Sequence, residues 1–367
     1  MQHNAVKALT MGAMLMALAL VAGCESEPES QSPVRFEGSI FGTFYQITVA
    51  DTLDQNAQEA LEDGFLDELE RVDEAMSTYR DDSDLVAFNQ APLDEWQSLP
   101  PPLIKVMSIS QQISRQSDGA FDVTIGGLVN LWSFGPEARP ESVPGEGELS
   151  ARLEQVGFDA LEVDTDGSRA RRSRDVFVDL SAVAKGYATD RVAAYLDEQG
   201  IDNYLVNLGG DLTTSGYRDP DEQMPWRIGI EKPRSSGQSA QYIIPLSGLS
   251  AATSGDYRNY FEQDGQRFSH TIDPRTGRPI SHSLASVTVV HPSNARADAW
   301  ATAMTVLGGE EGMALAQALD LKVLMLVRDE DSWQSLASPA FADFIGADFM
   351  ADHNIKVAGD TSAETQG

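Results

Sequence analysis

The sequence has one cysteine, Cys24, and few basic residues. A single cysteine excludes a disulfide framework and a Cys-x-x-Cys metal cage within one chain. Lysine and arginine together number 26, against 57 aspartates and glutamates, which gives a formal net charge of −31. Because phosphate backbones are recruited by positive fields, this balance argues against nucleic-acid binding and is typical of a solvated acidic surface.

Two phosphate-binding signatures are missing as well. The chain contains neither Gly-x-x-x-x-Gly-Lys-Ser/Thr nor a suitably placed Gly-x-Gly-x-x-Gly, so neither a P-loop nor a Rossmann dinucleotide site is supported. The turn from Asp179 to Asp190 offers another route to anions. It joins an expected strand at 176–178 to a helix that runs through Leu196, and such turns present backbone N–H groups and a helix N-terminus.

The N-terminus carries an apolar run at 8–22, which follows Lys7 and ends in Val21-Ala22-Gly23-Cys24. This pattern predicts a secretory signal that is too short for a membrane span. Its ending resembles the lipobox of bacterial lipoproteins, in which the cysteine becomes the lipid-bearing first residue. An ordinary signal peptide with a coincidental cysteine is the alternative interpretation.

We therefore expect a lipid-anchored protein of the bacterial envelope, with its folded domain facing the periplasm. The polar stretch Glu25–Pro33 is interrupted by prolines and is typical of a tether. The expected parts are a signal peptide over 1–23, the lipidated Cys24 with a flexible tether over 24–34, a folded domain over 35–350 and a disordered tail over 351–367.

Hydrophobic periodicity predicts alternating strands and helices in the body of the chain. The expected helices cover 55–75, 103–116, 149–156, a stretch from Ala297 to about Gly308-Gly309, and 311–319. The expected strands cover 34–49, 176–178, 204–211 with a glycine turn, 226–233, 241–246, 286–290 and 321–327.

The stretch from Thr253 to Pro279 groups hydroxylic, acidic and basic residues around His270, and we interpret it as part of a site. Such a segment is poor core material because each buried polar group would need its own partner. Asp298 and Thr302 are four residues apart, so their oxygens share one helical face and suit Mg²⁺. The alternative for that pair is a capping aspartate and a threonine that bonds back to its helix.

Read together, these segments resemble the ApbE family of FAD:protein FMN transferases, over about 41–307. The resemblance rests on motifs in a fixed order: Phe41-Gly42-Thr43, Ser77-Thr78-Tyr79, Gly119-Ala120-Phe121-Asp122-Val123-Thr124, the turn from Asp179 to Asp190, Asn207-Leu208-Gly209-Gly210-Asp211, Thr253-Ser254-Gly255-Asp256-Tyr257, His270-Thr271-Ile272-Asp273-Pro274-Arg275-Thr276-Gly277 and Ala297-Asp298-Ala299-Trp300-Ala301-Thr302. It implies an α+β fold of mixed, mostly antiparallel sheets packed with helices, in a T-fold-like architecture.

The resemblance also implies a reaction and a site. The family cleaves FAD at its pyrophosphate and moves FMN onto a Ser or Thr hydroxyl of a partner protein, releasing AMP. Mg²⁺ would be held by the Asp298 carboxylate, the Thr302 hydroxyl and backbone oxygens near Ala182 and Ala301. His270 and Asp298 would be the catalytic residues, with His270 as general acid or base. FAD, the substrate, would lie along Phe41, Tyr79, Ala120, Phe121, Asp122, Asp179, Lys185 and Ile272.

Tyr79 is ambiguous from spacing alone, since it suits either a half-buried core position or a stacking surface. The expected partners are FAD, a flavin-accepting subunit of a sodium-translocating or electron-transport respiratory complex, and the membrane through the lipid anchor. Alternatives for the whole protein are an FAD pyrophosphatase, in which water replaces the acceptor, and a flavin-binding carrier lipoprotein without chemistry. A scaffold that recruits basic partners to its acidic surface is a third alternative.

Overall fold

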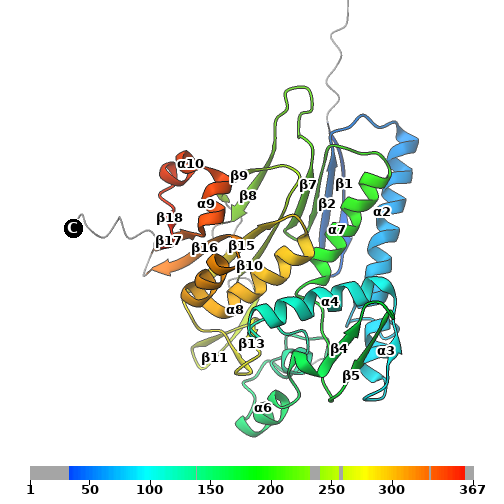
Figure 1. Cartoon of the computed structure of the whole chain (residues 1–367), viewed down its shortest axis with the longest axis vertical. Coiled ribbons are helices and arrows are strands. Elements are labelled where there is room, and N and C mark those ends of the chain that lie inside the picture. The colour runs from blue at the N-terminus through cyan, green and yellow to red at the C-terminus, as the bar shows by residue number, and fades with distance from the viewer. Residues whose placement is uncertain (1–32, 138, 232–239, 256–258, 330–331, 360–367) are drawn as a thin grey trace, which may run out of the picture. The chain divides into compact units, whose positions relative to one another are not determined.

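A nine-stranded sheet forms the spine of the fold, in the order β1-β2-β6-β7-β10-β15-β16-β17-β18 (Figure 1). The computed structural model describes residues 33–137, 139–231, 240–255, 259–329 and 332–359. Neighbouring strands of the sheet are antiparallel, except that β17 and β18 are parallel. The strands are β1 (Val34–Ile40), β2 (Thr43–Val49), β6 (Tyr204–Leu208), β7 (Asp211–Ser215), β10 (Ser250–Gly255), β15 (Leu284–His291), β16 (Lys322–Asp329), β17 (Ser332–Ala337) and β18 (Lys356–Val357).

Both faces of this sheet are buried, and successive side chains of one strand enter different cores. In β16, Val323 and Met325 pack with the long helices, whereas Leu324 and Leu326 join a second cluster on the other face. This follows from the two-residue period of a strand. The first face carries α2 (Gln55–Met76), α4 (Pro101–Gln116), α7 (Ala184–Glu198) and α8 (Asn294–Ala318). The second carries the ribbon β8 (Trp226–Glu231) and β9 (Ala240–Leu246), with α9 (Pro339–Ile345) and α10 (Ala347–Asp352).

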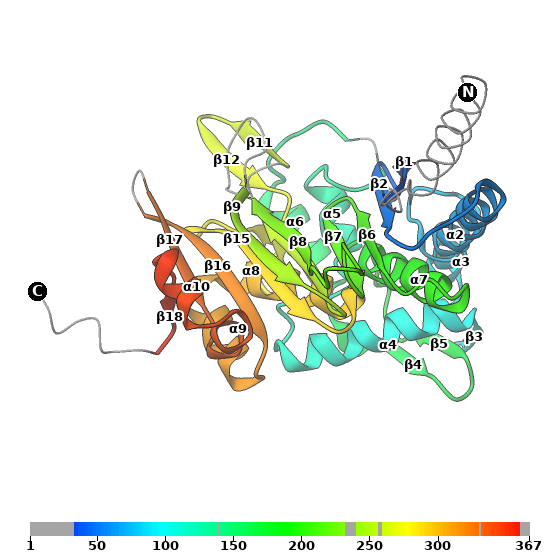
Figure 2. The ribbon, with the colours of Figure 1, turned by 90° about the horizontal axis from the view of Figure 1, so that it is seen from above.

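Figure 2 shows α2 beside the β1 end of the sheet and α9 and α10 beside the β16 to β18 end. A third hydrophobic cluster lies apart from the two large ones and includes Trp132, Phe261 and Ile272. The Trp132 indole N–H donates to the Gly277 carbonyl at 2.8 Å and so holds the 270–279 loop against α5. This region contains α5 (Gly126–Leu131), α6 (Glu146–Leu153), β11 (Tyr260–Gln263), β12 (Gln266–Ser269), β13 (Ile272–Asp273) and β14 (Arg278–Pro279).

The remaining elements are small, and those that Figure 1 labels lie near α2 and α4. They are α3 (Asp84–Gln90), β3 (Gln97–Ser98), the 3-10 turn Phe158–Ala160, β4 (Leu161–Asp164) and β5 (Arg169–Arg172). Helix α3 has a capped N-terminus, since the Ser83 side chain accepts the Val86 N–H.

Helix α8 carries the predicted break near Gly308-Gly309. Gly308 has a φ of 80°, which leaves the helical path, and the residues on either side are helical. His282 occupies the space that a side chain at Gly308 would need, and its Nε2 donates to the Thr305 carbonyl at 2.9 Å. A glycine is therefore required at this position both for its backbone angle and for the close approach of His282.

The expected fold class, α+β with mostly antiparallel sheets packed with helices, is confirmed. Three local predictions are wrong. The 34–49 segment is a hairpin, because Phe41 and Gly42 turn the chain with positive φ angles of 53° and 70°. Residues 176–178 form an isolated bridge at Phe177, where Asn89 takes both backbone groups of Val178.

The third correction concerns the expected end of the folded domain at residue 350. Helix α10 continues to Asp352, and β18 adds a strand to the sheet at Lys356–Val357. Ile355 is buried in the second cluster, which explains why the chain stays packed here. Among the described residues, no helix is long and apolar enough to cross a membrane.

Candidate active site

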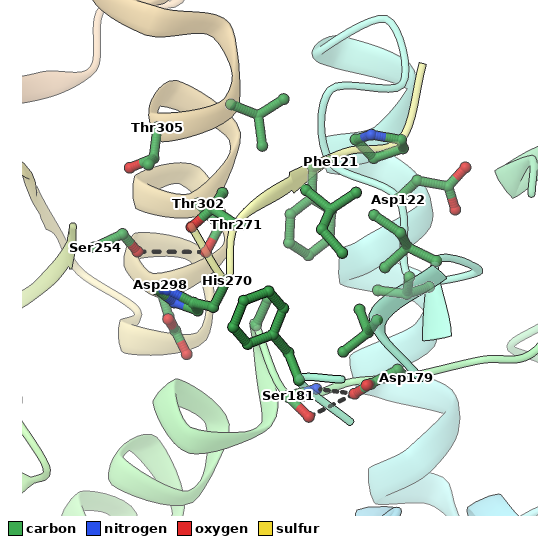
Figure 3. A pocket seen from close by; sticks show the side chains of 18 of the residues that line it. Phe121, Asp122, Asp179, Ser181, Ser254, His270, Thr271, Asp298, Thr302 and Thr305 are labelled. Carbon is green, nitrogen blue, oxygen red and sulfur yellow. Dashed lines mark hydrogen bonds between the residues drawn. The ribbon is translucent and has the colours of Figure 1, made fainter. Parts of the chain in front are cut away.

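A cavity of about 490 Å³ opens where the start of α8 faces the 120–134 segment and the 270–274 loop (Figure 3). Segments from distant parts of the chain supply its walls. Most of the residues predicted from the sequence line it together: Tyr79, Ala120, Phe121, Asp122, Asp179, Ala182, Lys185, His270, Ile272, Asp298 and Thr302.

Two predicted residues do not line the cavity. Phe41 sits in the β1–β2 turn and packs, partly buried, against the main core. Ala301 is fully buried in α8, and its carbonyl oxygen accepts the Thr305 hydroxyl at 2.8 Å. Cys24 and the Asp256-Tyr257 end of one motif lie outside the described residues.

On one side of the cavity Lys185 and Asp298 line the space, and Asp211 is buried beside Lys185. We call these three residues the charged wall. The Lys185 ammonium pairs with the Asp211 carboxylate, which is 1% exposed at the start of β7. Asp298 Oδ2 accepts the Gly186 N–H at 3.1 Å, which joins α8 to α7. A Cβ at Gly186 would stand 2.8 Å from the Asp298 Cβ, so only glycine permits this approach.

The charges of this wall do not balance. Burial and the nearby Asp298 carboxylate raise the pKa of Asp211, although Lys185 acts in the opposite direction. Burial lowers the pKa of Lys185, but the carboxylates of Asp211 and Asp298 outweigh it and raise that pKa overall. Two carboxylates against one ammonium leave an excess of negative charge that a cation would neutralise.

The donor set of this wall fits a hard cation. Asp298 and Thr302 both face the cavity from one side of α8, and the Thr302 hydroxyl lies 3.3 Å from that of Ser254 (Figure 3). In the described part of the chain, no group of three or more His, Cys, Asp or Glu is placed to hold a metal ion. The available ligands are therefore one carboxylate and neutral oxygens, a set that suits Mg²⁺ when substrate phosphates and water complete its shell.

The opposite side, which we call the turn wall, carries Asp122 and Asp179. Asp122 accepts the backbone N–H and hydroxyl of Thr124 and the Phe158 N–H, all within 2.8 Å. Asp179 accepts the N–H and hydroxyl of Ser181. Burial raises the pKa of Asp122, although these hydrogen bonds act to lower it. The carboxylates of the turn wall thus hold loops in place.

His270 enters the cavity from the start of the 270–279 loop. Its Nδ1 lies 3.0 Å from the Asn259 carbonyl oxygen, which also accepts the His270 backbone N–H at 3.1 Å. A carbonyl oxygen only accepts, so Nδ1 carries the proton. In the neutral imidazole, Nε2 therefore holds the lone pair and is able to accept a proton.

The aromatic residues divide between core and rim. Phe121 is 2% exposed and belongs to the main core, so it forms the part of the cavity wall that adjoins this core. Tyr79 is 70% exposed, which excludes the core interpretation and leaves its ring free to stack on a planar ligand. Half-buried Phe134 meets the His270 ring edge-on, with the ring centroids 6.3 Å apart.

Several residues of the site were missed from sequence. Asp211 was noted only within a glycine-turn motif, yet it is the partner of Lys185. Ser181, Ser254 and Thr305 also line the cavity. Ser254 belongs to a quoted motif and Ser181 to the predicted turn, but spacing alone could not show which hydroxyls face the ligand space.

This geometry describes an α+β protein with a cavity suited to a phosphate-bearing ligand, and comparison with known proteins agrees. The model of the ApbE family matches residues 41–325. The FAD:protein FMN transferase of Vibrio cholerae is 43% identical over 331 residues, which cover 90% of this chain and 97% of that protein. The Escherichia coli K12 protein of the same name is 36% identical over 349 residues, with 92% and 97% covered.

Solved structures agree in the same way. The flavin transferase ApbE from Vibrio cholerae has a TM-score of 0.78 at 41% identity and covers 85% of this chain and 99% of its own. The apo flavinyl transferase ApbE from Pseudomonas stutzeri has a TM-score of 0.78 at 39% identity, with 86% and 98% covered. The chain belongs to the ApbE family.

Proposed function

We propose that this chain is a transferase that cleaves FAD and attaches its FMN half, through a phosphoester bond, to a Ser or Thr hydroxyl of a partner protein. One observation carries the proposal: Lys185, Asp298 with Thr302, and His270 line one cavity although they are far apart in the chain. These are the groups that phosphoryl transfer needs, namely positive charge, metal ligands and a base. The names of the relatives support the same reaction.

The reaction breaks one phosphorus–oxygen bond and forms another. The acceptor hydroxyl oxygen bonds to the phosphorus of the FMN half, while the bond from that phosphorus to the bridging oxygen breaks and AMP leaves with that oxygen. The hydroxyl proton passes to Nε2 of His270, which the Asn259 carbonyl holds in the required tautomer. The Lys185 ammonium has three N–H donors, of which Asp211 uses one, and the others would donate to the pyrophosphate.

Mg²⁺ would be held by Asp298 and Thr302, with Ser254 beside them, and would neutralise charge on the transferred phosphoryl group. The protein's own contribution is to fix these oxygens. The Gly186 N–H donates to Oδ2 of Asp298 and so orients this carboxylate. Backbone oxygens near Ala182 and Ala301 would complete the site, and for Ala301 this requires sharing the oxygen that Thr305 now contacts.

The test is to incubate the full-length protein in detergent with FAD, Mg²⁺ and a flavin-accepting subunit of a respiratory complex. We expect the acceptor to gain the mass of one FMN phosphoester and an equal amount of AMP to appear. If a verified acceptor shows no increase in mass, the proposal is wrong. FMN and AMP released at the same rate without an acceptor would identify an FAD pyrophosphatase, and intact FAD would identify a carrier.

We also propose an envelope location, in which the lipidated Cys24 anchors the protein and the folded part faces the periplasm. The support is the apolar run that ends in Val21-Ala22-Gly23-Cys24. Metabolic labelling with a clickable palmitate analogue should mark the wild-type protein and leave Cys24→Ala unlabelled. Equal labelling of the two proteins would contradict the anchor.

A further inference from the structure

Asp190 lies on α7, five residues after Lys185, and does not line the cavity. Its carboxylate contacts the beginning of α8. Oδ1 accepts the Asn294 N–H at 2.6 Å, and Oδ2 accepts the Ser293 hydroxyl at 2.7 Å and the Ala295 N–H at 3.1 Å. The side chain of Ser293 does not cap α8 itself. A carboxylate from another helix therefore satisfies N–H groups that have no partner within α8.

The same turn of α8 is also joined to the sheet. The Asn294 side-chain amide donates to the Leu212 carbonyl at 2.7 Å. Leu212 follows Asp211, the partner of Lys185. One turn further along α8, Asp298 accepts the Gly186 N–H. The contacts therefore form a closed ring through α7, β7 and α8, and three members of this ring are the residues of the charged wall.

Within this ring α7 and α8 are in close contact. A Cβ at Gly186 would stand 2.6 Å from the Asn294 carbonyl oxygen. Asp190 meets the same residue, Asn294, from four positions further along α7. Two contacts that far apart fix both the distance and the rotation between the helices. If a catalytic or metal-binding side chain is misplaced by about 1 Å, the reaction rate can fall on the order of 100-fold.

We propose that Asp190 is a positioning residue that holds α8 against α7 so that Asp298 and Thr302 face the cation and the phosphates. Its carboxylate touches neither substrate nor metal. This inference rests on the proposed function for the identity of the reaction, but the position of Asp298 can be followed separately through Mg²⁺ binding. Loss of the carboxylate would let the first turns of α8 shift away from Lys185.

The test compares full-length Asp190→Ala and Asp190→Asn with wild type. For Asp190→Ala we expect the Mg²⁺ concentration for half-maximal transfer to rise by about 10- to 100-fold, as for other groups that orient metal ligands. High Mg²⁺ should restore much of the rate. The rise in Tm that Mg²⁺ causes in the wild type should shrink. Asp190→Asn keeps one acceptor oxygen, so its Mg²⁺ requirement should lie between those of wild type and Asp190→Ala.

Asp51→Ala is the matched control. Asp51 also accepts three hydrogen bonds, from the Asp202 and Asn203 N–H groups and the Asn203 amide at 2.7 to 3.1 Å, but it joins the end of β2 to β6 away from the cavity. Its loss should lower Tm and leave the Mg²⁺ requirement unchanged. This separates a general loss of stability from a displaced Asp298.

Three outcomes overturn the inference: a folded Asp190 variant with the wild-type Mg²⁺ requirement, an equal shift in Asp51→Ala, or a wild type that Mg²⁺ does not stabilise. If Asp190→Ala does not fold, Asp190→Asn is judged by the same criteria. If the wild type transfers no FMN, the proposed function fails. The Mg²⁺-dependent Tm values of wild type and variants then decide the inference about Asp190 on their own.

Discussion

Two pairs of buried aspartates stand at opposite sides of the cavity, and they differ in what their oxygens contact. Asp122 and Asp179 of the turn wall accept backbone N–H groups and hydroxyls from residues nearby. In the charged wall, Asp211 pairs with Lys185, and Asp298 accepts one backbone N–H, that of Gly186. The same residue type thus builds loops on one side and leaves unneutralised charge on the other.

This difference teaches that burial alone does not identify a functional carboxylate. All four of these side chains are at most 9% exposed. What separates them is whether the surrounding donors already neutralise the charge, because a satisfied carboxylate has little left to offer a ligand. Substitutions of aspartate by asparagine test this, because they remove the carboxylate charge and leave the side-chain volume nearly constant.

The largest effect is expected for Asp298→Asn. It removes the negative charge and one hard oxygen ligand while keeping an acceptor for the Gly186 N–H. Loss of about 4 kcal/mol of transition-state stabilisation corresponds to a rate on the order of 1,000-fold lower. The measurement is the rate of FMN transfer at saturating FAD. Asp122→Asn is the control, and a similar loss in both variants would erase the distinction between the walls.

The next effect is expected for His270→Ala, which removes the proton acceptor and leaves the charged wall intact. A positioned general base contributes at least about 100-fold, so transfer should fall by that factor. The Tm increase caused by Mg²⁺ should persist, because His270 is not among the expected ligands. A wild-type rate in a folded His270→Ala protein would remove this residue from the mechanism.

Asp122→Asn should affect stability more than activity. An asparagine keeps an oxygen for Thr124 but turns an amide NH₂ toward the Phe158 N–H. Leaving a buried donor without an acceptor costs about 1 to 3 kcal/mol in the free energy of unfolding. Urea unfolding measures this cost, and transfer per folded molecule should stay within about 3-fold of wild type. An unchanged unfolding free energy would show that the turn wall does not depend on this carboxylate.

The same variant has a pH dependence of known sign. Burial raises the folded pKa of Asp122 above its ordinary value of 3.8. The folded state then binds more protons than the unfolded state, so this carboxyl stabilises the fold most at acid pH and less as pH rises through its folded pKa. Asparagine does not titrate. The wild-type advantage over Asp122→Asn should fall as pH rises above about 4, and an increase with pH would contradict the direction of the shift.

The smallest effect is expected for Tyr79→Ala at the exposed rim. Stacking of one aromatic ring on a flavin or adenine is worth about 1 kcal/mol, which corresponds to an increase of about 5-fold in KM for FAD. The transfer rate at saturating FAD should stay near wild type, because Tyr79 belongs to neither wall. Steady-state kinetics at varied FAD separates the two parameters, and a lowered kcat with unchanged KM would place Tyr79 in the chemistry.

Local features of the fold were predictable from the sequence in segments where a single hydrophobic period dominates. Helix α2 was expected at 55–75 and runs to Met76, and the break in α8 falls at Gly308 as expected. The strand at 176–178 was wrong because a short apolar run cannot show whether a neighbouring strand is available. The end of the domain was placed too early, since the packing of α10 and β18 depends on strands far away in the sequence.

For the site residues too, the sequence predicted what local spacing sets and missed what distant packing sets. Spacing correctly put Asp298 and Thr302 on one face of a helix, because a helix repeats every 3.6 residues wherever it lies. Spacing could not show that Phe41 packs against the core instead of lining the cavity. The roles of the lining residues stay predictions for the experiments above.

By itself, the sequence determined the ordered motifs, the helical faces and the types of side chain available for phosphate and metal. These depend on neighbours along the chain, which folding does not rearrange. Only the tertiary structure decided that Lys185 pairs with Asp211 and that the oxygens of Asp122 are occupied by hydrogen bonds from loop residues. It also decided that Asp190 contacts the start of α8. Such contacts join residues that are distant in sequence or depend on burial, and both are set by how the helices and strands pack.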